Sequence, residues 1–278
     1  AVKKGNVYED SSIIDMVYNE NYLPDDQKDF FICMELANKN KDTKSMKIFA
    51  DMLRTGTILT ANKQRALNLY KELSDLGNSD AEFNYAQMLF YDDDIKGNKK
   101  VAIDCFKKLS DAGNPDAMNA YANILLAGDL IPSDKSQAAT LYKISADKGN
   151  ADSMYKYACM LDSGEIIPVD KKKAANYYQK AADKGNVDAM YTYGVITLNG
   201  IYVPADKKEA AHYFKMASDK GHIGAMRNYA SLLDSGEGVP MNKAEADKYR
   251  KKADDKEKLL LELQKSPGAL ARYAFLIE

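Results

Sequence analysis

Apolar and small residues recur along this chain with the period of an α-helix. Met154, Tyr157, Ala158 and Leu161 fall at i, i+3, i+4 and i+7, which places them on one face of a helix. A second stretch with the same spacing follows over residues 170–185. Both stretches end at a glycine, the residue that most easily adopts the left-handed conformation at a helix C-terminus. They predict a pair of antiparallel helices, a first helix A and a second helix B.

This helix pair is repeated with a fixed period. Near-identical copies of the segment DKGN place glycines 36 residues apart, at Gly77, Gly113, Gly149, Gly185 and Gly221. A second glycine series keeps the same register, at Gly56, Gly128, Gly164, Gly200 and Gly236. No net insertion interrupts the register from residue 5 to about residue 256. Fixed-period similarity on this scale predicts a solenoid.

The predicted helices also begin at characteristic residues. An Asp or Asn precedes every helix B, at Asp26, Asn62, Asn98, Asp134, Asp170, Asp206 and Asn242. Helix A is expected to begin after Asn78, Asn114, Asn150 and Asn186. Such side chains accept hydrogen bonds from the free amides of the first turn and typically contribute ~1 kcal/mol relative to Ala. The segment DKGN is therefore predicted to be the joint between repeats.

These motifs resemble the Sel1-like repeat family, a relative of the tetratricopeptide repeats. The segments GEGVPMNKAEADKYRKKA (236–253) and DKKKAANYYQKAADKG (170–185) carry the family's loop and helix-B pattern. The resemblance covers residues 43–256 well and 5–42 weakly, since Phe30 and Phe31 replace an alanine pair and Lys41 replaces a glycine. It implies a scaffold or adaptor for protein complexes.

We predict an all-α fold, a right-handed α/α superhelical solenoid of about seven 36-residue helix-turn-helix repeats with a C-terminal capping helix. The single solenoid is expected to comprise a divergent N-terminal repeat over 1–42, six Sel1-like repeats over 43–258, and capping helices over 259–278. Glu257 replaces the stop glycine, so the last helix B should continue through KEKLLLELQK. Arg250 and Asp247 replace Tyr and Ala of other copies and favour a polar outer face.

Composition narrows the classes of partner. The net charge of −2 provides no basic field for nucleic acid. No apolar run approaches the roughly 20 residues of a membrane-spanning helix, so membrane insertion is not expected. Three widely spaced cysteines form neither a disulfide framework nor a zinc motif. An intracellular, cytoplasmic location is expected; the lumen of the endoplasmic reticulum is the alternative if a leader has been removed.

Few residues suggest chemistry. His212 and His222 are the only histidines, and surface or capping roles are expected for both. Cys105 shares a presumed core column with Cys33, and Cys159 lies on a helix A where it could be exposed. The acids of YDDDIKG (91–97) and the lysines 171–173 suggest a solvated loop and a solvated face. We therefore expect no cofactor, no metal and no catalytic residue.

A partner is expected to contact the side of helix A that faces away from the core. On a helical wheel this side holds columns that vary in chemistry from repeat to repeat, while the core columns do not. By analogy with tetratricopeptide solenoids, these columns would form a concave surface, where Tyr and Arg are effective anchors. The predicted partner-binding residues are Phe83, Asn119, Asn123, Tyr155, Lys156, Tyr191 and Arg227.

The leading functional hypothesis is a non-catalytic scaffold or adaptor that binds a protein or peptide on this surface, with self-association through the solenoid ends as an additional option. The first alternative is a structural or regulatory repeat segment of a larger protein, which could itself be enzymatic. An enzyme is the second alternative, but no cluster of acid, base, nucleophile or metal ligand supports it.

Overall fold

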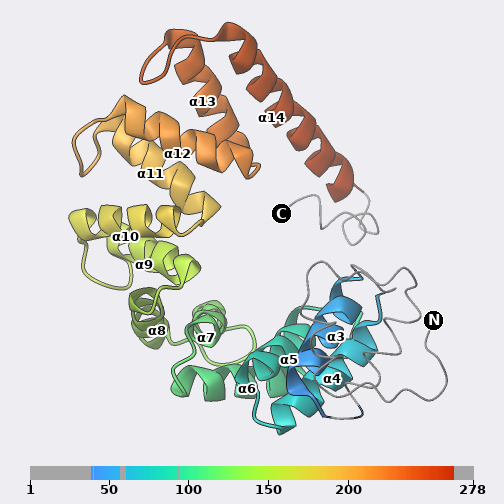
Figure 1. Cartoon of the computed structure of the whole chain (residues 1–278). Helices are drawn as coiled ribbons and strands as arrows, with labels where there is room; N and C mark the ends of the chain where they lie inside the picture. Colours follow the sequence, from blue (N-terminus) through green and yellow to red (C-terminus); the bar gives the residue numbers. More distant parts are fainter. Residues whose placement is uncertain (1–38, 40, 57–60, 93, 266–278) are drawn as a thin grey trace, which may run out of the picture. The chain divides into compact units, whose positions relative to one another are not determined.

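The computed structural model describes residues 39, 41–56, 61–92 and 94–265, which form helices and no strand (Figure 1). Eleven of the twelve helices are 13 residues long, and equivalent helices start 36 residues apart. The all-α repeat fold is thus confirmed. The helices are α3 (Thr43–Thr55), α4 (Lys63–Asp75), α5 (Ser79–Tyr91), α6 (Lys99–Asp111), α7 (Pro115–Ala127), α8 (Lys135–Asp147), α9 (Ala151–Ser163), α10 (Lys171–Asp183), α11 (Val187–Asn199), α12 (Lys207–Asp219), α13 (Ile223–Ser235) and α14 (Lys243–Gln264).

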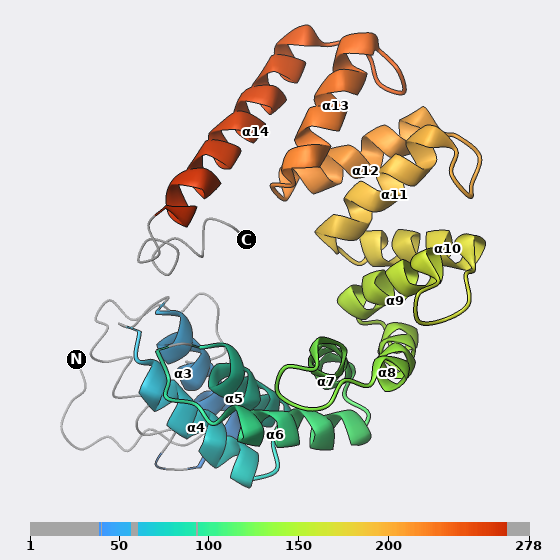
Figure 2. The same cartoon turned by 180° about the vertical axis from the view of Figure 1, so that it is seen from behind.

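The chain divides into two compact units, with the boundary inside α7. Unit 1 is Ala1–Ala117 and unit 2 is Met118–Glu278. Within unit 1, α3 packs on α4 and α5 packs on α6. Within unit 2, the pairs α9–α10, α11–α12 and α13–α14 follow one another in chain order (Figure 2). Odd-numbered helices are therefore the predicted helices A, and even-numbered helices are the helices B.

The predicted helix caps are present at the joints. Asn150 accepts a hydrogen bond from the Ser153 amide at 2.7 Å, and Asp170 accepts one from the Lys173 amide at 3.0 Å. Equivalent side-chain caps precede the other helices B from Asn62 to Asn242. Gly164 ends α9 with φ 72°, a conformation that a side chain would strain. These local interactions set both ends of each helix.

Alanine and tyrosine fill the space between helices A and B. Ala174 and Ala175 of α10 are buried, as are the corresponding alanine pairs of α8 and α12. The aromatic column that follows is also buried, with Tyr178 only 3% exposed. The predicted core face of α9 is buried as well, at Met154, Tyr157, Ala158, Met160 and Leu161. Small residues allow close helix approach, and the rings occupy the remaining volume.

Tyrosine–aspartate hydrogen bonds connect successive repeats of unit 2. The buried Tyr177 hydroxyl donates to Asp147 Oδ1 at 2.7 Å, and Tyr213 donates to Asp183 Oδ1 at 2.6 Å. The third bond joins Tyr249 to Asp219 at 3.2 Å. In each case the aspartate ends the preceding helix B, 30 residues earlier. Each hydroxyl is thus satisfied by a neighbouring repeat, which favours a single relative orientation of the two repeats.

Each of these tyrosines also packs edge-to-face against a tyrosine of its own helix A. Tyr177 meets Tyr157 with ring centroids 5.1 Å apart, and Tyr213 meets Tyr193 at 5.0 Å. The equivalent helix-B residues of earlier repeats are Leu69, Cys105 and Leu141, which have no hydroxyl to donate to the preceding aspartate. The tyrosine pairs and the aspartate bonds are therefore a feature of the last three repeats.

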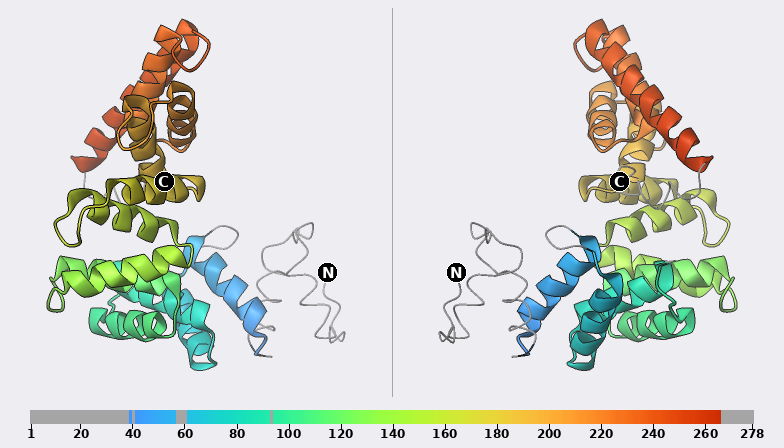
Figure 3. Two further views of the ribbon diagram at one scale, coloured as in Figure 1. Left: turned by 90° about the vertical axis from the view of Figure 1, so that its left-hand side faces the viewer. Right: turned by 90° about the vertical axis from the view of Figure 1, so that its right-hand side faces the viewer.

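The last helix continues beyond the repeat length, as predicted. α14 has 22 residues and passes through residue 258, where the sequence had suggested a boundary (Figure 3). Arg250 forms ion pairs with Asp234 and Asp247, so this position is polar where other repeats have a buried ring. The predicted repeat over 1–42 lies largely outside the described residues, and so do residues 266–278 of the predicted cap.

Removing one inter-repeat hydroxyl should weaken the solenoid measurably. We expect Tyr213→Phe to lower the free energy of unfolding by about 0.5–1.5 kcal/mol, because the bond to Asp183 is lost while the ring remains buried. Tyr157→Phe is the matched control, since it removes a hydroxyl and keeps the ring contact with Tyr177. Urea denaturation followed by circular dichroism measures both variants. Equal stability of Tyr213→Phe and the wild type would contradict the role of this bond.

The buried tyrosines predict loss of stability in alkali. Burial raises the pKa of Tyr193 to about 12, and burial followed by the aspartate hydrogen bonds raises the pKa values of Tyr177 and Tyr213. Unfolded tyrosines ionise near pH ~10. Above that pH the unfolded state binds fewer protons than the folded state, so stability falls as the pH rises. The urea midpoint should be lower at pH ~11 than at pH ~9; an unchanged midpoint would contradict this.

Candidate functional site

The outward side of the helices A in unit 2 is the candidate site, called here the helix-A surface. It comprises the positions of α7, α9, α11 and α13 that the repeat packing leaves exposed or half-buried. On α9, Asp152 and Lys156 are exposed while Tyr155 and Cys159 are half-buried. The corresponding residues of the other helices are Asn119, Asn123, Asp188, Tyr191, Thr192, Val195, Arg227 and Ser231. None of these side chains is fully buried.

Six of the seven predicted partner-binding residues lie on this surface. The seventh, Phe83, lies on α5 of unit 1. Lys156 and Arg227 are exposed, whereas Asn119, Asn123, Tyr155 and Tyr191 are half-buried. The structure therefore groups the six by helix face, but four of them are less open to solvent than ordinary surface positions.

The aromatic residues are held by the helix B of their own repeat. The ring of Tyr155 packs against Tyr178 with centroids 5.8 Å apart, and Tyr191 packs against Phe214 at 6.0 Å. In unit 1, Phe83 makes the same contact with Phe106 at 5.7 Å. Such rings keep one face against the core while the remainder reaches the surface. Because they stabilise the repeat, replacing them with alanine would destabilise the fold.

The two asparagines also have internal partners. The Tyr142 hydroxyl donates to Asn123 Oδ1 at 2.6 Å, and the Ser153 hydroxyl lies 3.1 Å from Asn119 Oδ1. The variable chemistry of the Asn123 column thus has a structural cause, because it follows the ring that helix B presents to it. The Asn123 column therefore also has a structural role, and its role in binding a partner stays a prediction.

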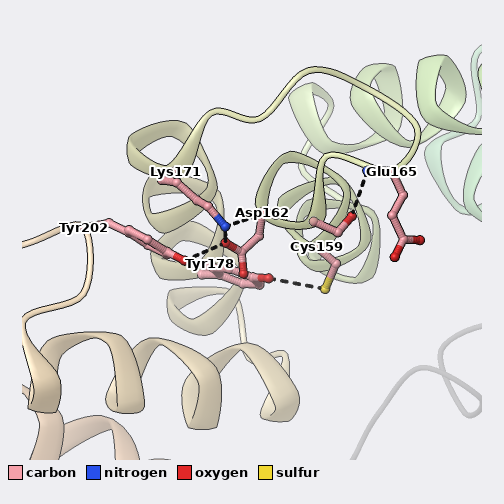
Figure 4. A network of polar contacts seen from close by, with 7 residues as sticks. Cys159, Asp162, Glu165, Lys171, Tyr178 and Tyr202 are labelled. Carbon is pink, nitrogen blue, oxygen red and sulfur yellow. Dashed lines mark hydrogen bonds and ion pairs between the residues drawn. The ribbon is translucent and has the colours of Figure 1, made fainter.

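Cys159 occupies the same column as Asn123 and has the same kind of contact. The Tyr178 hydroxyl lies 3.4 Å from Cys159 Sγ (Figure 4). The thiol is half-buried, so the expectation that it could be exposed is only partly correct. Cys105 is likewise half-buried rather than fully in the core, and burial raises the pKa of its thiol. A raised pKa lowers the thiolate fraction and hence the reactivity of this cysteine.

Lysines at the start of helix B make contacts between repeats. Lys171 Nζ lies 2.8 Å from Asp162 Oδ1, which also accepts a hydrogen bond from the Tyr202 hydroxyl of the following repeat at 2.9 Å (Figure 4). In unit 1, Lys63 pairs with Asp92 at 3.0 Å and Asp94 at 2.7 Å. The acidic loop and the first lysine of the 171–173 run are therefore parts of inter-repeat contacts, which corrects their interpretation as simply solvated.

Arg227 of the helix-A surface is held by two ion pairs. Its guanidinium contacts Asp254 at 3.2 Å and Glu257 at 2.6 Å, both on α14. The hydrogen bonds to Glu257 and Asp254 raise the pKa of Arg227. This pairing ties α13 to the extended part of α14. Lys156 has no ion pair or hydrogen bond among the described residues, so it offers the more available positive charge.

The histidines do not form a reactive group with each other. His212 is exposed on α12, beside the ring of Tyr213. His222 caps α13, because its Nδ1 accepts a hydrogen bond from the Ala225 amide at 3.0 Å. Within residues 39, 41–56, 61–92 and 94–265, no three His, Cys, Asp or Glu side chains are grouped so as to hold a metal ion.

Sequence reasoning missed the tyrosine–aspartate bonds and the cysteine and asparagine contacts with tyrosine. A signal for the first was present, since Asp and Tyr recur with a separation of 30 residues in three consecutive repeats. The second pattern links residues 19 apart, where Asn123, Cys159 and Asp51 each face a helix-B tyrosine.

Among the described helices, none is sufficiently long and apolar to span a membrane.

Comparison with known proteins agrees with this architecture. The Sel1 repeat matches the chain six times, at residues 50–78, 79–114, 115–150, 151–186, 187–222 and 223–253. A search of curated protein sequences found no match.

Solved structures with the same fold include a Sel1 repeat protein from Oxalobacter formigenes. It is 22% identical with a TM-score of 0.69, over 77% of this chain and 87% of that one. The protective antigen c5321 of uropathogenic Escherichia coli strains, described as having an SLR fold, is 18% identical with a TM-score of 0.71. That match covers 89% of this chain and 54% of the antigen.

A third similar structure is the immunity protein Pa5087 from Pseudomonas aeruginosa, at 19% identity and a TM-score of 0.51, covering 76% of this chain and 81% of that one. At these identities the structural matches establish the fold alone. The six sequence matches span more than half of the chain with the observed 36-residue register. The chain therefore belongs to the Sel1 repeat family.

Proposed function

We propose that this chain is a non-catalytic scaffold or adaptor that binds a protein or peptide through the helix-A surface of unit 2. Sel1 repeat proteins generally mediate protein–protein interactions, and the family is typically non-catalytic. The observation that carries the proposal is a set of exposed and half-buried helix-A positions that recurs on α7, α9, α11 and α13 beside a buried core. Its exposed positions, such as Lys156, can therefore vary without loss of the fold.

The aromatic residues of this surface suit a binding role. Tyr155 and Tyr191 are each held on one side by an aromatic ring of helix B, at 5.8 and 6.0 Å. Side chains that are already ordered lose little conformational entropy when a partner binds. Tyrosine also combines a broad apolar face with a hydroxyl, which is typical of residues that dominate interface energetics. We take these two rings as the anchors of the proposed interface.

Lys156 supplies the charge of the proposed interface. It is exposed on α9, adjacent in sequence to Tyr155. Arg227 is already paired with two acids of α14, so a partner would have to replace those contacts. Asn119 and Asn123 use their side-chain oxygens internally and would offer their amide groups to a partner. This division of roles refines the original set of seven residues.

The expectations about the shape of the surface, the cellular compartment and self-association are part of the same proposal. A concave form of the binding surface is expected by analogy with tetratricopeptide solenoids. The two cysteines of the described part, Cys105 and Cys159, are free thiols, which supports a reducing intracellular compartment. The polar contacts of Arg250 at the last repeat favour a capped end over self-association through that end.

Lys156→Glu is the sharpest test of the interface, because this side chain has no structural partner to lose. We expect the variant to fold normally and to bind the partner at least about fivefold more weakly than the wild type does. That change corresponds to the loss of an interface contact worth about 1 kcal/mol. Affinity capture from a lysate of source cells identifies the partner by mass spectrometry. Titration of the purified partner against each variant then measures the dissociation constant.

Lys172→Glu is the matched control, since it makes the same charge change on α10, in the same unit and on the other helix of the pair. Lys172 is exposed and should leave the affinity unchanged. Equal affinity of the wild type and Lys156→Glu would contradict the assignment of the helix-A surface. Selective weakening by Lys172→Glu would place the interface on the helix-B side instead.

A further inference from the structure

The joint before α13 differs from the joints before α5, α7, α9 and α11, while Asp42 caps α3. Asparagine caps the helix at Asn78, Asn114, Asn150 and Asn186, whereas His222 occupies the corresponding position before α13. Both residue types satisfy the same first-turn amide. The asparagine carboxamide accepts from Ala189 at 2.7 Å, and the His222 imidazole Nδ1 accepts from Ala225 at 3.0 Å. Only the imidazole can change its charge between pH 5 and 8.

The cap requires the neutral form of His222. Nδ1 can accept the Ala225 N–H only while it carries no proton, so the ring must hold its proton on Nε2. Protonation of Nδ1 would place two N–H donors against each other and add a positive charge at the helix N-terminus. The helix dipole already makes that end electropositive. Protonation therefore opposes the cap by both the lost hydrogen bond and the added charge.

The surroundings hold the imidazole in this position. His222 is half-buried and stacks on Tyr191 with ring centroids 4.3 Å apart and an interplanar angle of 21°. Gly224 leaves room for the stack, because a Cβ there would lie 3.1 Å from the imidazole and 3.2 Å from the Tyr191 ring, closer than most side-chain contacts. Other repeats with an asparagine joint have Asp at the position of Gly224, as at Asp188. The histidine, the tyrosine and the glycine thus form one local arrangement.

The charged groups near the imidazole act in opposite directions. Asp188 of α11 favours the protonated form, while Lys256 of α14 disfavours it. Burial is the largest influence and lowers the pKa of His222 below its usual value. Because the folded-state pKa is lowered, the contribution of the group to stability is complete above the unfolded value. It is lost as the pH falls through the folded-state pKa.

We infer that His222 makes the joint between α12 and α13 a pH-sensitive hinge, closed when the imidazole is neutral and loosened when it is protonated. Loosening begins with the first turn of α13 and with the stack on Tyr191. Tyr191 belongs to the helix-A surface, so acid would also change that surface, a consequence that rests on the proposed function. The hinge itself does not depend on it.

Amide hydrogen exchange of the folded chain tests the hinge directly. His222→Asn is the matched variant, because it installs the residue that caps four other helices A and does not titrate. Between pH ~7.5 and pH ~5.5, the protection factor of the Ala225 amide should fall about fivefold or more in the wild type relative to the variant. The Ala189 amide, capped by Asn186, is the internal control and should behave alike in both proteins.

Equal protection of Ala225 in both proteins at both pH values would overturn the inference. Nitrogen NMR of the wild-type imidazole is an independent measurement that needs no variant. A neutral ring protonated on Nε2, titrating below pH ~6.5, agrees with the cap. A neutral ring protonated on Nδ1, or titration above that pH, would also overturn the inference. Neither measurement involves a partner, so failure of the proposed function would leave the result unaffected.

Discussion

The solenoid depends on one constraint, the close stacking of helices through small residues between capped joints. A single helix pair cannot bury its apolar face alone, so each pair needs a neighbour in the same orientation. Ala174 and Ala175 allow close approach, and Tyr178 fills the space that remains. The orientation is set at the joint, where Gly149 and Asn150 end one helix and begin the next. Any insertion there would misalign the small residues with their neighbours.

This constraint decides which positions remain for function. Several polar side chains outside the core face already have a structural partner in a neighbouring repeat. Tyr177 bonds to the preceding repeat through Asp147, and Lys171 contacts the following one through Tyr202. On the proposed helix-A surface, too, Asn123 and Cys159 face a tyrosine of helix B. A partner surface in this fold is therefore built on residues that also support the repeat.

Because surface residues also support the repeat, a change at one joint affects a residue of the helix-A surface. An asparagine cap is insensitive to pH, and its replacement by His222 keeps the hydrogen bond while adding a titratable ring. That ring stacks on Tyr191, and Gly224 leaves more room for the stack than the usual aspartate would. Two departures from the repeat pattern at one joint thereby couple the stability of a helix end to Tyr191 of the helix-A surface. The joints capped by asparagine lack a titratable ring, so their stability does not depend on this coupling.

The sequence by itself determined the helix ends, the repeat register and the buried columns. These follow from interactions within three or four residues, such as the cap of Asp170 on Lys173, and from a period that can be counted. Tertiary structure decided the partners of the polar side chains. The hydrogen bond of Tyr213 to Asp183 joins residues 30 apart in the sequence, and that of Tyr142 to Asn123 joins residues 19 apart. Neither sequence separation follows from helical periodicity alone. Both depend on how adjacent helices approach, which packing sets.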